Sequence, residues 1–413
     1  MKVTVVQIGA RHHYAIPRML ESMQMLAALH TDAVAVKGMG RVLPLLPGLR
    51  GQPPVAKLAA RIPKGVPNAK IRQTDALLRR RLRGMLRLGP MPEGYLEDDH
   101  LFDRIAASWG FAGADTLYAM QKHGTKLLAA ARAAGVRTVV DIFINPQAHR
   151  IVQAERERFP DIETLDADPA MLDFEDERTL REIEHADLLL CPGMNVVEGL
   201  ASYPEAAGKA FAVVPYGSGV SFAGRRNKPV SRRILFAGTA DLRKGIHYLG
   251  QAAKRLAGKG YEFRVAGGAS EKVRSHPMMS DLNFLGRVPR AEMSKEFLNA
   301  DLFVLPTLAE GCASVVHEAV MAGCPVITTR ASGTLVENGR GGLIVPERDP
   351  QALAEAIEAI VDDRDYRNRL AASCAGLAEE LSEERWGQRL VAALADRNPS
   401  KIQPQMGLEL IAK

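Results

Sequence analysis

Three scarcities limit what this 413-residue chain can be. It contains no apolar run approaching the roughly 20 residues that cross a bilayer as a helix. Aromatic residues make up only 5%, which disfavours a protein that stacks bases of single-stranded nucleic acid. The four cysteines (Cys191, Cys312, Cys324 and Cys374) show neither Cys-x-x-Cys nor Cys/His spacing. A zinc site or a disulfide framework is therefore disfavoured, and a reducing cytoplasm is favoured.

What is present fits a globular protein. Hydrophobic residues make up 46% and charged residues 25%, and the length exceeds one ordinary core, so we expect two domains. The first ten residues have the pattern of a strand rather than of a signal peptide. The net charge of +6 suits acidic small molecules, anionic lipid heads or nucleic acid about equally. No basic group accompanies a nucleic-acid recognition element, so we expect no nucleic acid as partner.

Strand-like and helix-like segments alternate along much of the chain. Residues 3–8 read as a strand, 17–28 as a helix and 33–36 as a second strand, whereas prolines make 40–98 irregular. The second half alternates more cleanly, and the polar segment 225–231 reads as a linker. Its expected strands are 234–237, 263–266, 283–285, 302–305 and 325–328. Such alternation predicts parallel sheets, which bind ligands at the carboxyl ends of their strands.

Two carboxylates eight residues apart, Glu310 and Glu318, follow one of these strands through a loop into a helix. Gly311 lets backbone come close to a ligand, and Ala313 and Ser314 stand where free N–H groups of the helix can bind a diphosphate. Glu310 can accept hydrogen bonds from sugar hydroxyls, and Glu318 can hold a ribose diol. As a bare pair of acids, the two residues can equally be a solvated loop carboxylate and a helix-start charge.

The same stretch resembles the E-x7-E motif of glycosyltransferase family 4. The residues are EGCA at 310–313 and EAVMAGCPV at 318–326, with Cys312 in place of an aromatic residue, Ala313 in place of Gly and Val320 in place of Met. Further similar segments are 234–248 (ILFAGTADLRKGIHY), 283–288, 300–306 and 337–346. The resemblance is specific over 230–395 and diffuse before that.

The resemblance implies a GT-B fold, in which two Rossmann-like, doubly wound parallel-sheet domains face a cleft. Residues 1–225 are then the acceptor-side domain, joined by the segment 395–413, and 226–394 bind the nucleotide sugar. The last helix, 383–397, is expected to cross back to the first domain. The implied activity is a hexosyl transfer that retains the anomeric configuration and uses no metal or cofactor. Its donor is a UDP- or GDP-linked sugar.

The resemblance also assigns the residues that hold this donor. Lys244 matches a cation that binds the diphosphate, while Thr239 stands where the family commonly has Arg, so that Arg243 either compensates or points to solvent. Gly286 and Val288 lie in the segment that resembles the base-binding loop. With Lys244 and Glu310, these residues form the expected donor site. Cys312 and Ala313 are expected to reshape its sugar pocket.

Acceptor-side candidates come from the first half of the chain. Gly9, Arg11 and His13 form the loop after the first strand, which should approach the donor phosphates. His149 is the nearest match to a catalytic histidine of the family, although it can equally cap the next helix. Glu155 is expected on the solvated face of that helix.

An Arg-rich run spans residues 77–88. It can lie on an anionic membrane surface, which would suit a lipid-linked or envelope-polysaccharide acceptor, or it can be a solvated helix face. The expected location is therefore cytoplasmic, with peripheral contact at the inner membrane face left open. Two other functions also remain open: a nucleotide-sugar 2-epimerase, and a degenerate, non-catalytic GT-B subunit.

Overall fold

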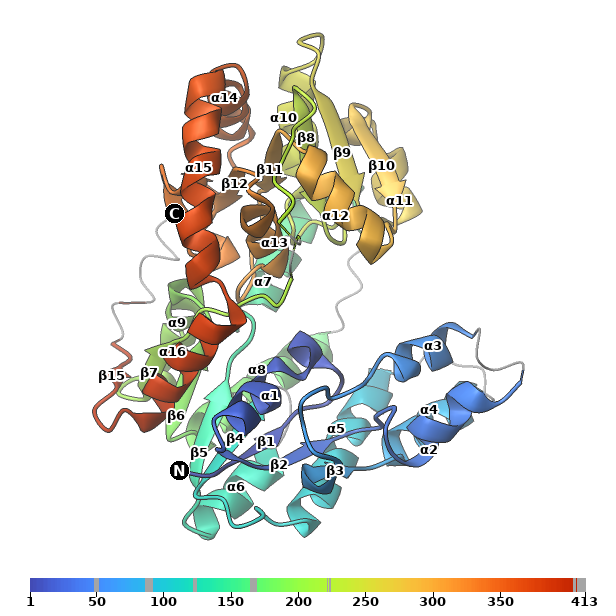
Figure 1. Ribbon diagram of the computed structural model, residues 1–413, viewed down its shortest axis with the longest axis vertical. Coiled ribbons are helices and arrows are strands. Elements are labelled where there is room, and N and C mark those ends of the chain that lie inside the picture. The colour runs from blue at the N-terminus through green and yellow to red at the C-terminus, as the bar shows by residue number, and fades with distance from the viewer. Residues whose placement is uncertain are drawn as a thin grey trace.

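The computed structural model describes residues 1–47, 52–85, 92–121, 125–163, 169–220, 222, 224–403 and 406. Two β-sheets organise this chain, each covered by helices (Figure 1). The expectation of parallel sheets in two α/β domains is confirmed, since every strand pair is parallel except β15 with β7.

The amino-terminal sheet has eight strands in the order β15-β7-β6-β5-β4-β1-β2-β3. Their bounds are β1 (Val3–Val6), β2 (Leu26–Thr31), β3 (Ile71–Gln73), β4 (Thr116–Met120), β5 (Arg137–Asp141), β6 (Leu188–Cys191), β7 (Ala210–Val213) and β15 (Ser400–Lys401). Alternate residues pack to opposite faces: in β4, Tyr118 and Met120 join one apolar cluster, and Leu117 and Ala119 join the other. A strand buried on both faces therefore reads as a continuous apolar run.

Helices and short 3-10 segments connect these strands. They are η1 (Arg11–Tyr14), α1 (Ala15–Ser22), α2 (Gly38–Val42), η2 (Leu43–Leu45), α3 (Pro53–Ala59), η3 (Asn68–Lys70), α4 (Ala76–Met85), α5 (Pro92–Ser108), α6 (Thr125–Ala133), α7 (Ala148–Arg158), α8 (Pro169–His185), α9 (Met194–Ala201) and η4 (Pro204–Ala206). The Arg-rich run 77–88 begins in α4, and its last three residues lie outside the described ranges.

The carboxyl-terminal sheet has seven strands in the order β10-β9-β8-β11-β12-β14-β13. Their bounds are β8 (Arg233–Ala237), β9 (Glu262–Ala266), β10 (Leu282–Gly286), β11 (Leu302–Leu305), β12 (Val326–Thr329), β13 (Glu337–Asn338) and β14 (Gly341–Val345). The helical segments are α10 (Ile246–Arg255), α11 (Glu271–Ser275), η5 (Pro277–Met279), α12 (Arg290–Asn299), α13 (Ser314–Ala322), η6 (Arg330–Ser332), α14 (Pro350–Val361), α15 (Arg364–Glu380) and α16 (Glu383–Ala395).

Two helices cross between the sheets. After α15 on the carboxyl-terminal domain, α16 returns to the amino-terminal core, where Trp386 and Leu390 are buried and Glu383 pairs with Arg18 of α1. In the other direction, α7 leaves the amino-terminal sheet and reaches the carboxyl-terminal domain (Figure 1). The residues after it, up to Glu163, pack there, and Ile162 is buried in the carboxyl-terminal core.

Two expectations near the amino terminus are wrong. The helix expected at 17–28 ends at Ser22, and the second strand occupies Leu26–Thr31 instead of 33–36. Gln24 adopts a φ of 59° and turns the chain there, although the apolar residues on both sides continue a helix-like pattern. The expected linker at 225–231 is bonded into the carboxyl-terminal domain, because the amide of Asn227 donates to the carbonyls of Phe297 and Ala300.

Candidate functional site

A carboxylate and two cations meet at the carboxyl ends of β8 and β11. Oε1 of Glu310 lies 2.5 Å from Nζ of Lys244 and 2.7 Å from a guanidinium nitrogen of Arg243. The Glu310 and Lys244 side chains are each only 12% exposed. Arg243 therefore turns into the site instead of pointing to solvent. With two cations on one carboxylate, the cluster keeps an excess positive charge that suits an anionic ligand.

The loops that carry these side chains are locked to each other. The N–H of Leu308 and the hydroxyl of Thr307 both donate to the carbonyl of Arg243. Gly245 caps the start of α10 with a φ of 72°, and a Cβ there would lie 1.9 Å from the carbonyl oxygen of Pro306. Only glycine fits at this approach. The backbone thus holds Lys244 and Glu310 at a fixed separation.

Gly311 allows a close contact between the domains, besides the approach to a ligand that the sequence predicts. A Cβ at this position would lie 1.9 Å from the carbonyl oxygen of Phe143, which belongs to the other domain. Beside it, the carbonyl of Glu310 accepts hydrogen bonds from the side-chain amide of Asn195, at 2.7 Å, and from the N–H of Asn145, at 3.3 Å. The missing side chain therefore lets the two domains touch beside the charged cluster, and not only a ligand approach.

Glu318 lines a cavity of about 310 Å³ between the domains. The polar lining also includes His13 of the first loop, and Arg290 and Ser294 of α12. The apolar lining is Val220, Phe222, Val288, Met293 and Phe297. Burial raises the pKa of Glu318, although the charge of Arg290 opposes the rise. The structure thus brings three sequence candidates, His13, Val288 and Glu318, to one cavity of a size that admits a small ligand.

Ala313 and Ser314 lie at the start of α13. Ala313 is buried and caps the helix without a side-chain hydrogen bond, while Ser314 is exposed at the first helical position. Helix amide groups at such an end attract anions. At the ends of two other strands, Gly286 adopts a φ of 69° and its carbonyl accepts the N–H of Gly267, whereas Thr239 is exposed beside Gly238.

Cys312 replaces the family's aromatic residue with a thiol that packs against the amino-terminal core. Its sulfur lies 3.4 Å from Nε2 of His317 on the next helix. Burial raises the pKa of Cys312 to about 12, and it lowers the pKa of His317 to about 3. Both groups are therefore neutral near pH 7, and we expect them to shape this region rather than to supply charge.

The first loop is strained. His12, His13 and Tyr14 are three successive non-glycine residues with positive φ, at 47°, 51° and 60°. Such conformations persist only where the surroundings enforce them, and they gather at functional sites. The guanidinium of Arg11 lies 3.8 Å from the centre of the Phe143 ring, and the N–H of Gly9 donates to Asp32. His13 reaches across to Arg290 at 3.2 Å.

His149 lies at the start of α7, and its imidazole faces a carboxylate of α8. Its Nε2 lies 3.2 Å from the carboxylate of Asp176, which also pairs with Arg150 and accepts the hydroxyl of Tyr203 at 2.7 Å. A catalytic role for His149 stays a prediction.

Glu155 is the functional candidate that sequence reasoning missed, because it was expected on a solvated face. It is fully buried, and its carboxylate binds Nε2 of His247 at 3.0 Å, the hydroxyl of Tyr248, and Nε of Arg348 at 2.9 Å. Burial alone would raise its pKa, but these hydrogen bonds outweigh it and lower the pKa to about 2. His247 and Tyr248 lie on α10, the helix that follows Lys244 in the sequence. The carboxylate of Glu155 therefore bonds α7 to that helix.

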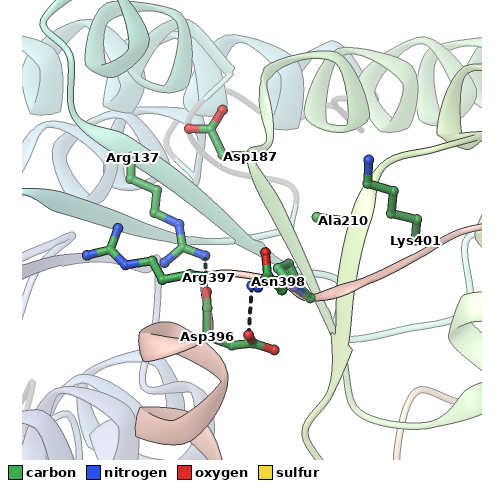
Figure 2. A pocket seen from close by; sticks show the side chains of 8 residues that line it. Arg137, Asp187, Ala210, Asp396, Arg397, Asn398 and Lys401 are labelled. Carbon is green, nitrogen blue, oxygen red and sulfur yellow. Dashed lines mark hydrogen bonds between the residues drawn. The ribbon is translucent and has the colours of Figure 1, made fainter.

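A second hollow, of about 560 Å³, lies at the amino ends of strands in the amino-terminal sheet (Figure 2). Its lining includes Arg137 and Ala210, which begin β5 and β7, and the exposed Arg397 and Lys401 near β15. Because ligands of open parallel sheets bind at the carboxyl ends of the strands, this amino-end hollow is not the expected donor site.

The described part of the chain has neither a membrane-spanning helix nor a metal cluster. No helix there is long and apolar enough to cross a membrane. Within the same ranges, no group of three His, Cys, Asp or Glu side chains is arranged to hold a metal ion. All four cysteines are free thiols.

Two facing, doubly wound parallel-sheet domains with a cavity between them define the GT-B class of folds. A sucrose-phosphate synthase of Thermosynechococcus elongatus matches 100% of this chain and 99% of its own, with a TM-score of 0.64 and 15% identity. HepE of Anabaena, solved with UDP and glucose, matches 96% of this chain and 100% of its own, with a TM-score of 0.59 and 15% identity. The predicted GT-B fold is confirmed.

Sequence likeness concentrates in the carboxyl-terminal domain. Residues 231–363, which include Lys244, Glu310 and Glu318, match the family model of Glycosyl transferases group 1. The capsular polysaccharide biosynthesis glycosyltransferase CapM of Staphylococcus aureus is 35% identical over 146 residues, covering 33% of this chain and 38% of CapM. The lipopolysaccharide core biosynthesis glycosyltransferase LpsE of Rhizobium meliloti is 36% identical over 144 residues, covering 33% of this chain and 42% of LpsE. The chain thus spans well under half the length of these relatives.

Proposed function

We propose that this protein is a retaining glycosyltransferase of family 4, which moves a hexose from a nucleotide diphosphate sugar to an acceptor. The observation that carries the proposal is the meeting of Lys244, Arg243 and Glu310 at adjacent strand ends, at the start of the segment that leads to Glu318 in the cavity lining. The family match over 231–363 and the polysaccharide-biosynthesis relatives support the same class of reaction.

The donor would lie across these two features. Its nucleoside, the uridine or guanosine of a UDP- or GDP-linked sugar, would occupy the 310 Å³ cavity, with the ribose diol on Glu318 and the base near Val288. The diphosphate would lie between Lys244, Arg243 and the amino end of α13 at Ser314. Glu310 would then hold the hydroxyls of the sugar. HepE was solved with UDP and glucose, which supports a UDP-linked donor for this chain.

The chemistry asked of these residues is electrostatic. Cleavage of the bond between the anomeric carbon and the diphosphate develops positive charge on the sugar and negative charge on the leaving group. Lys244 and Arg243, fixed by their loops, would stabilise the diphosphate without reorganising. The acceptor would attack from the face that the diphosphate leaves, which retains the configuration. Closure of His13 and Arg11 over the donor would exclude water.

The acceptor class that we propose is a cell-envelope glycan or a lipid-linked sugar, in agreement with the capsular and lipopolysaccharide relatives. The proposed location is cytoplasmic. The free state of all four cysteines supports a reducing compartment.

A ligand screen tests the proposal. UDP, GDP and their sugar conjugates would be compared for their effect on the melting temperature, because a ligand that binds only the folded state raises it. At least one nucleotide diphosphate should raise it, and Lys244→Ala should abolish the rise. Lys254→Ala, at an exposed lysine of α10, the helix that follows Lys244, is the matched control. Incubation with the donor alone should then give slow hydrolysis. An epimerised sugar, or a melting temperature that no nucleotide shifts, would contradict the proposal.

A further inference from the structure

The chain carries its charge very unevenly. Residues 38–47 and 52–85, here called the basic lobe, contain ten Lys and Arg and a single acid, Asp75, for a net charge of +9. Since the whole chain has a net charge of +6, the remaining residues sum to −3. A molecule with this asymmetry orients its basic lobe toward an anionic partner.

The basic lobe also exposes aliphatic side chains. Four of the eight large hydrophobic residues exposed in the described part of the chain belong to it: Val42 (53%), Leu45 (76%), Leu46 (41%) and Ile62 (42%). The exposed cations Arg41, Lys57 and Lys64 lie in the same segment. None of these three cations forms an ion pair with a described residue. Aliphatic groups beside unpaired cations are the combination that binds the interface of an anionic bilayer, where apolar groups enter and cations meet phosphates.

The basic lobe is attached to the candidate site. Arg61 pairs with Asp32 at 2.5 Å, and the other carboxylate oxygen of Asp32 accepts the N–H of Gly9, in the first loop, at 2.8 Å. Lys70 pairs with Glu21 of α1, and the backbone at Gly65 lies against the side chain of Arg18. Figure 1 shows α2, α3 and α4 gathered at one end of the amino-terminal domain. The edge of the basic lobe therefore continues into the loop that would receive the acceptor.

We propose that the basic lobe docks on the surface of a bilayer that contains anionic lipid, with Val42, Leu45 and Leu46 among the head groups and Arg41, Lys57 and Lys64 on their phosphates. This docking would bring the first loop next to the bilayer, where a lipid-linked acceptor would meet it. The docking stands on the lobe alone, whereas the lipid-linked acceptor rests on the proposed function.

Two other occupants fit less well. Nucleic acid would use the cations but would leave Leu45 and its aliphatic neighbours in water without a role. A second copy of this chain would place one strongly positive lobe against another, and like charges oppose that contact. The bilayer is the partner that uses both features of the lobe.

The test is vesicle binding by the full chain. Sedimentation would compare vesicles of phosphatidylcholine alone with vesicles that also contain phosphatidylglycerol. We expect binding to the anionic vesicles only, weakened by salt. Binding should fall on the order of 100-fold when Arg41, Lys57 and Lys64 are all changed to Gln, because each cation near such a surface contributes about 1 kcal/mol. Leu45→Ser with Leu46→Ser should weaken the binding that remains at high salt.

The matched control changes Lys254, Arg397 and Lys401 to Gln. These exposed cations lie outside the lobe and form no ion pair with a described residue, so the control removes the same net charge. It should keep wild-type vesicle binding. The proposal is overturned if wild-type protein ignores anionic vesicles, if both triple variants lose binding equally, or if the lobe variant loses binding to an RNA but not to vesicles.

Donor hydrolysis in the same samples separates this proposal from the proposed function. The lobe variant should hydrolyse the donor at the wild-type rate while it no longer sediments with vesicles. If wild-type protein sediments with anionic vesicles but hydrolyses no sugar nucleotide, the docking stands and the proposed function fails. If it hydrolyses the donor but never sediments, the docking fails and the proposed function stands.

Discussion

In the carboxyl-terminal half of the site one carboxylate binds two cations, whereas in the amino-terminal half a cation lies over an aromatic ring. Glu310 binds Lys244 and Arg243 from the neighbouring strand end. Across the cavity, Arg11 lies over Phe143, and the nearby carboxylate of Asp141 is hydrogen-bonded by the hydroxyls of Tyr118 and Tyr216. The carboxyl-terminal half of the site is thus charged and partly neutralised, and the amino-terminal half is buried and nearly neutral.

The difference lies in how each half is built. In the carboxyl-terminal half, strand ends of one sheet place the charged side chains, and hydrogen bonds between the loops fix their separation. In the amino-terminal half, a loop with three successive positive φ angles carries His13 toward Arg290 of the other domain. Donor binding should therefore depend on single charged residues, and the acceptor side should depend on the conformation of the loop.

The largest effect should come from the shared charges of the donor half. Lys244→Ala or Glu310→Gln should lower kcat about 10²- to 10³-fold, because each removes a fixed charge that acts on the developing diphosphate or the sugar. Circular dichroism and the unfolding midpoint should stay close to wild type. Turnover of a nucleotide sugar is the measurement. If either variant turned over the nucleotide sugar as fast as Lys254→Ala does, Lys244 and Glu310 would not act in catalysis, and the contrast between the two halves of the site would fail.

The next effect tests the tie between the halves. Glu155→Gln removes a buried charge from beside His247 and Arg348, so the free energy of unfolding should fall by about 3 kcal/mol. Urea unfolding measures the loss. Glu157→Gln, an exposed residue on the same helix, should stay within about 0.5 kcal/mol of wild type. If both variants unfold alike, α7 does not anchor the carboxyl-terminal domain.

The sequence predicts the carboxyl-terminal half of the molecule well and the amino-terminal half poorly. The strands expected at 234–237, 263–266 and 302–305 agree with β8, β9 and β11 to within a residue or two, and the helix expected after Glu310, with free N–H groups at Ala313 and Ser314, is α13. Local pattern and tertiary structure agree in this half, because strands and helices alternate regularly and glycines mark the start of α10, at Gly245, and the end of α13, at Gly323. The meeting of Lys244 with Glu310 followed from adjacent strand ends.

The first half escaped prediction for physical reasons. The region 40–98 was expected to be irregular, yet it contains α2, α3, β3, α4 and part of α5, because short elements between prolines show little periodicity. Glu155 stands in a helix whose sequence is mostly polar, so its burial depends on the other domain and leaves no local signal. The positive φ of His13 is likewise enforced by its surroundings rather than by a glycine.

A smaller effect should separate nucleoside binding from chemistry. Glu318→Ala should raise KM for the donor about 30-fold with less change in kcat, because a hydrogen bond to a charged group contributes about 2 kcal/mol. Initial rates over a range of donor concentrations give both constants. Glu292→Ala, an exposed carboxylate on α12 near the cavity, is the control and should change neither. A fall in kcat with unchanged KM would place Glu318 at the reacting sugar instead of at the ribose.

The smallest effect concerns the strained loop and sharpens the amino-terminal side of the comparison. Burial, with help from the charges of Arg11 and His13, lowers the pKa of His12 to about 4, so the folded loop favours the neutral imidazole. The stability that this residue contributes is complete above its unfolded pKa of about 6.5 and is lost as the pH falls from there toward 4. Since the side chain is only partly enclosed, the loss should be on the order of 1 kcal/mol.

His12→Asn isolates this term, because asparagine tolerates the φ of 47° and does not titrate. Other groups titrate in the same window: burial lowers the pKa of His30 to about 3, which adds to the loss, and raises that of Asp141 to about 6, which opposes it. The measurement is therefore the difference between the wild-type and variant unfolding free energies at pH 7 and at pH 4.5. The variant should be less acid-sensitive by that amount. Equal sensitivity would show that the ring of His12, held between Tyr216 and Trp386, can accept a proton without strain on the loop.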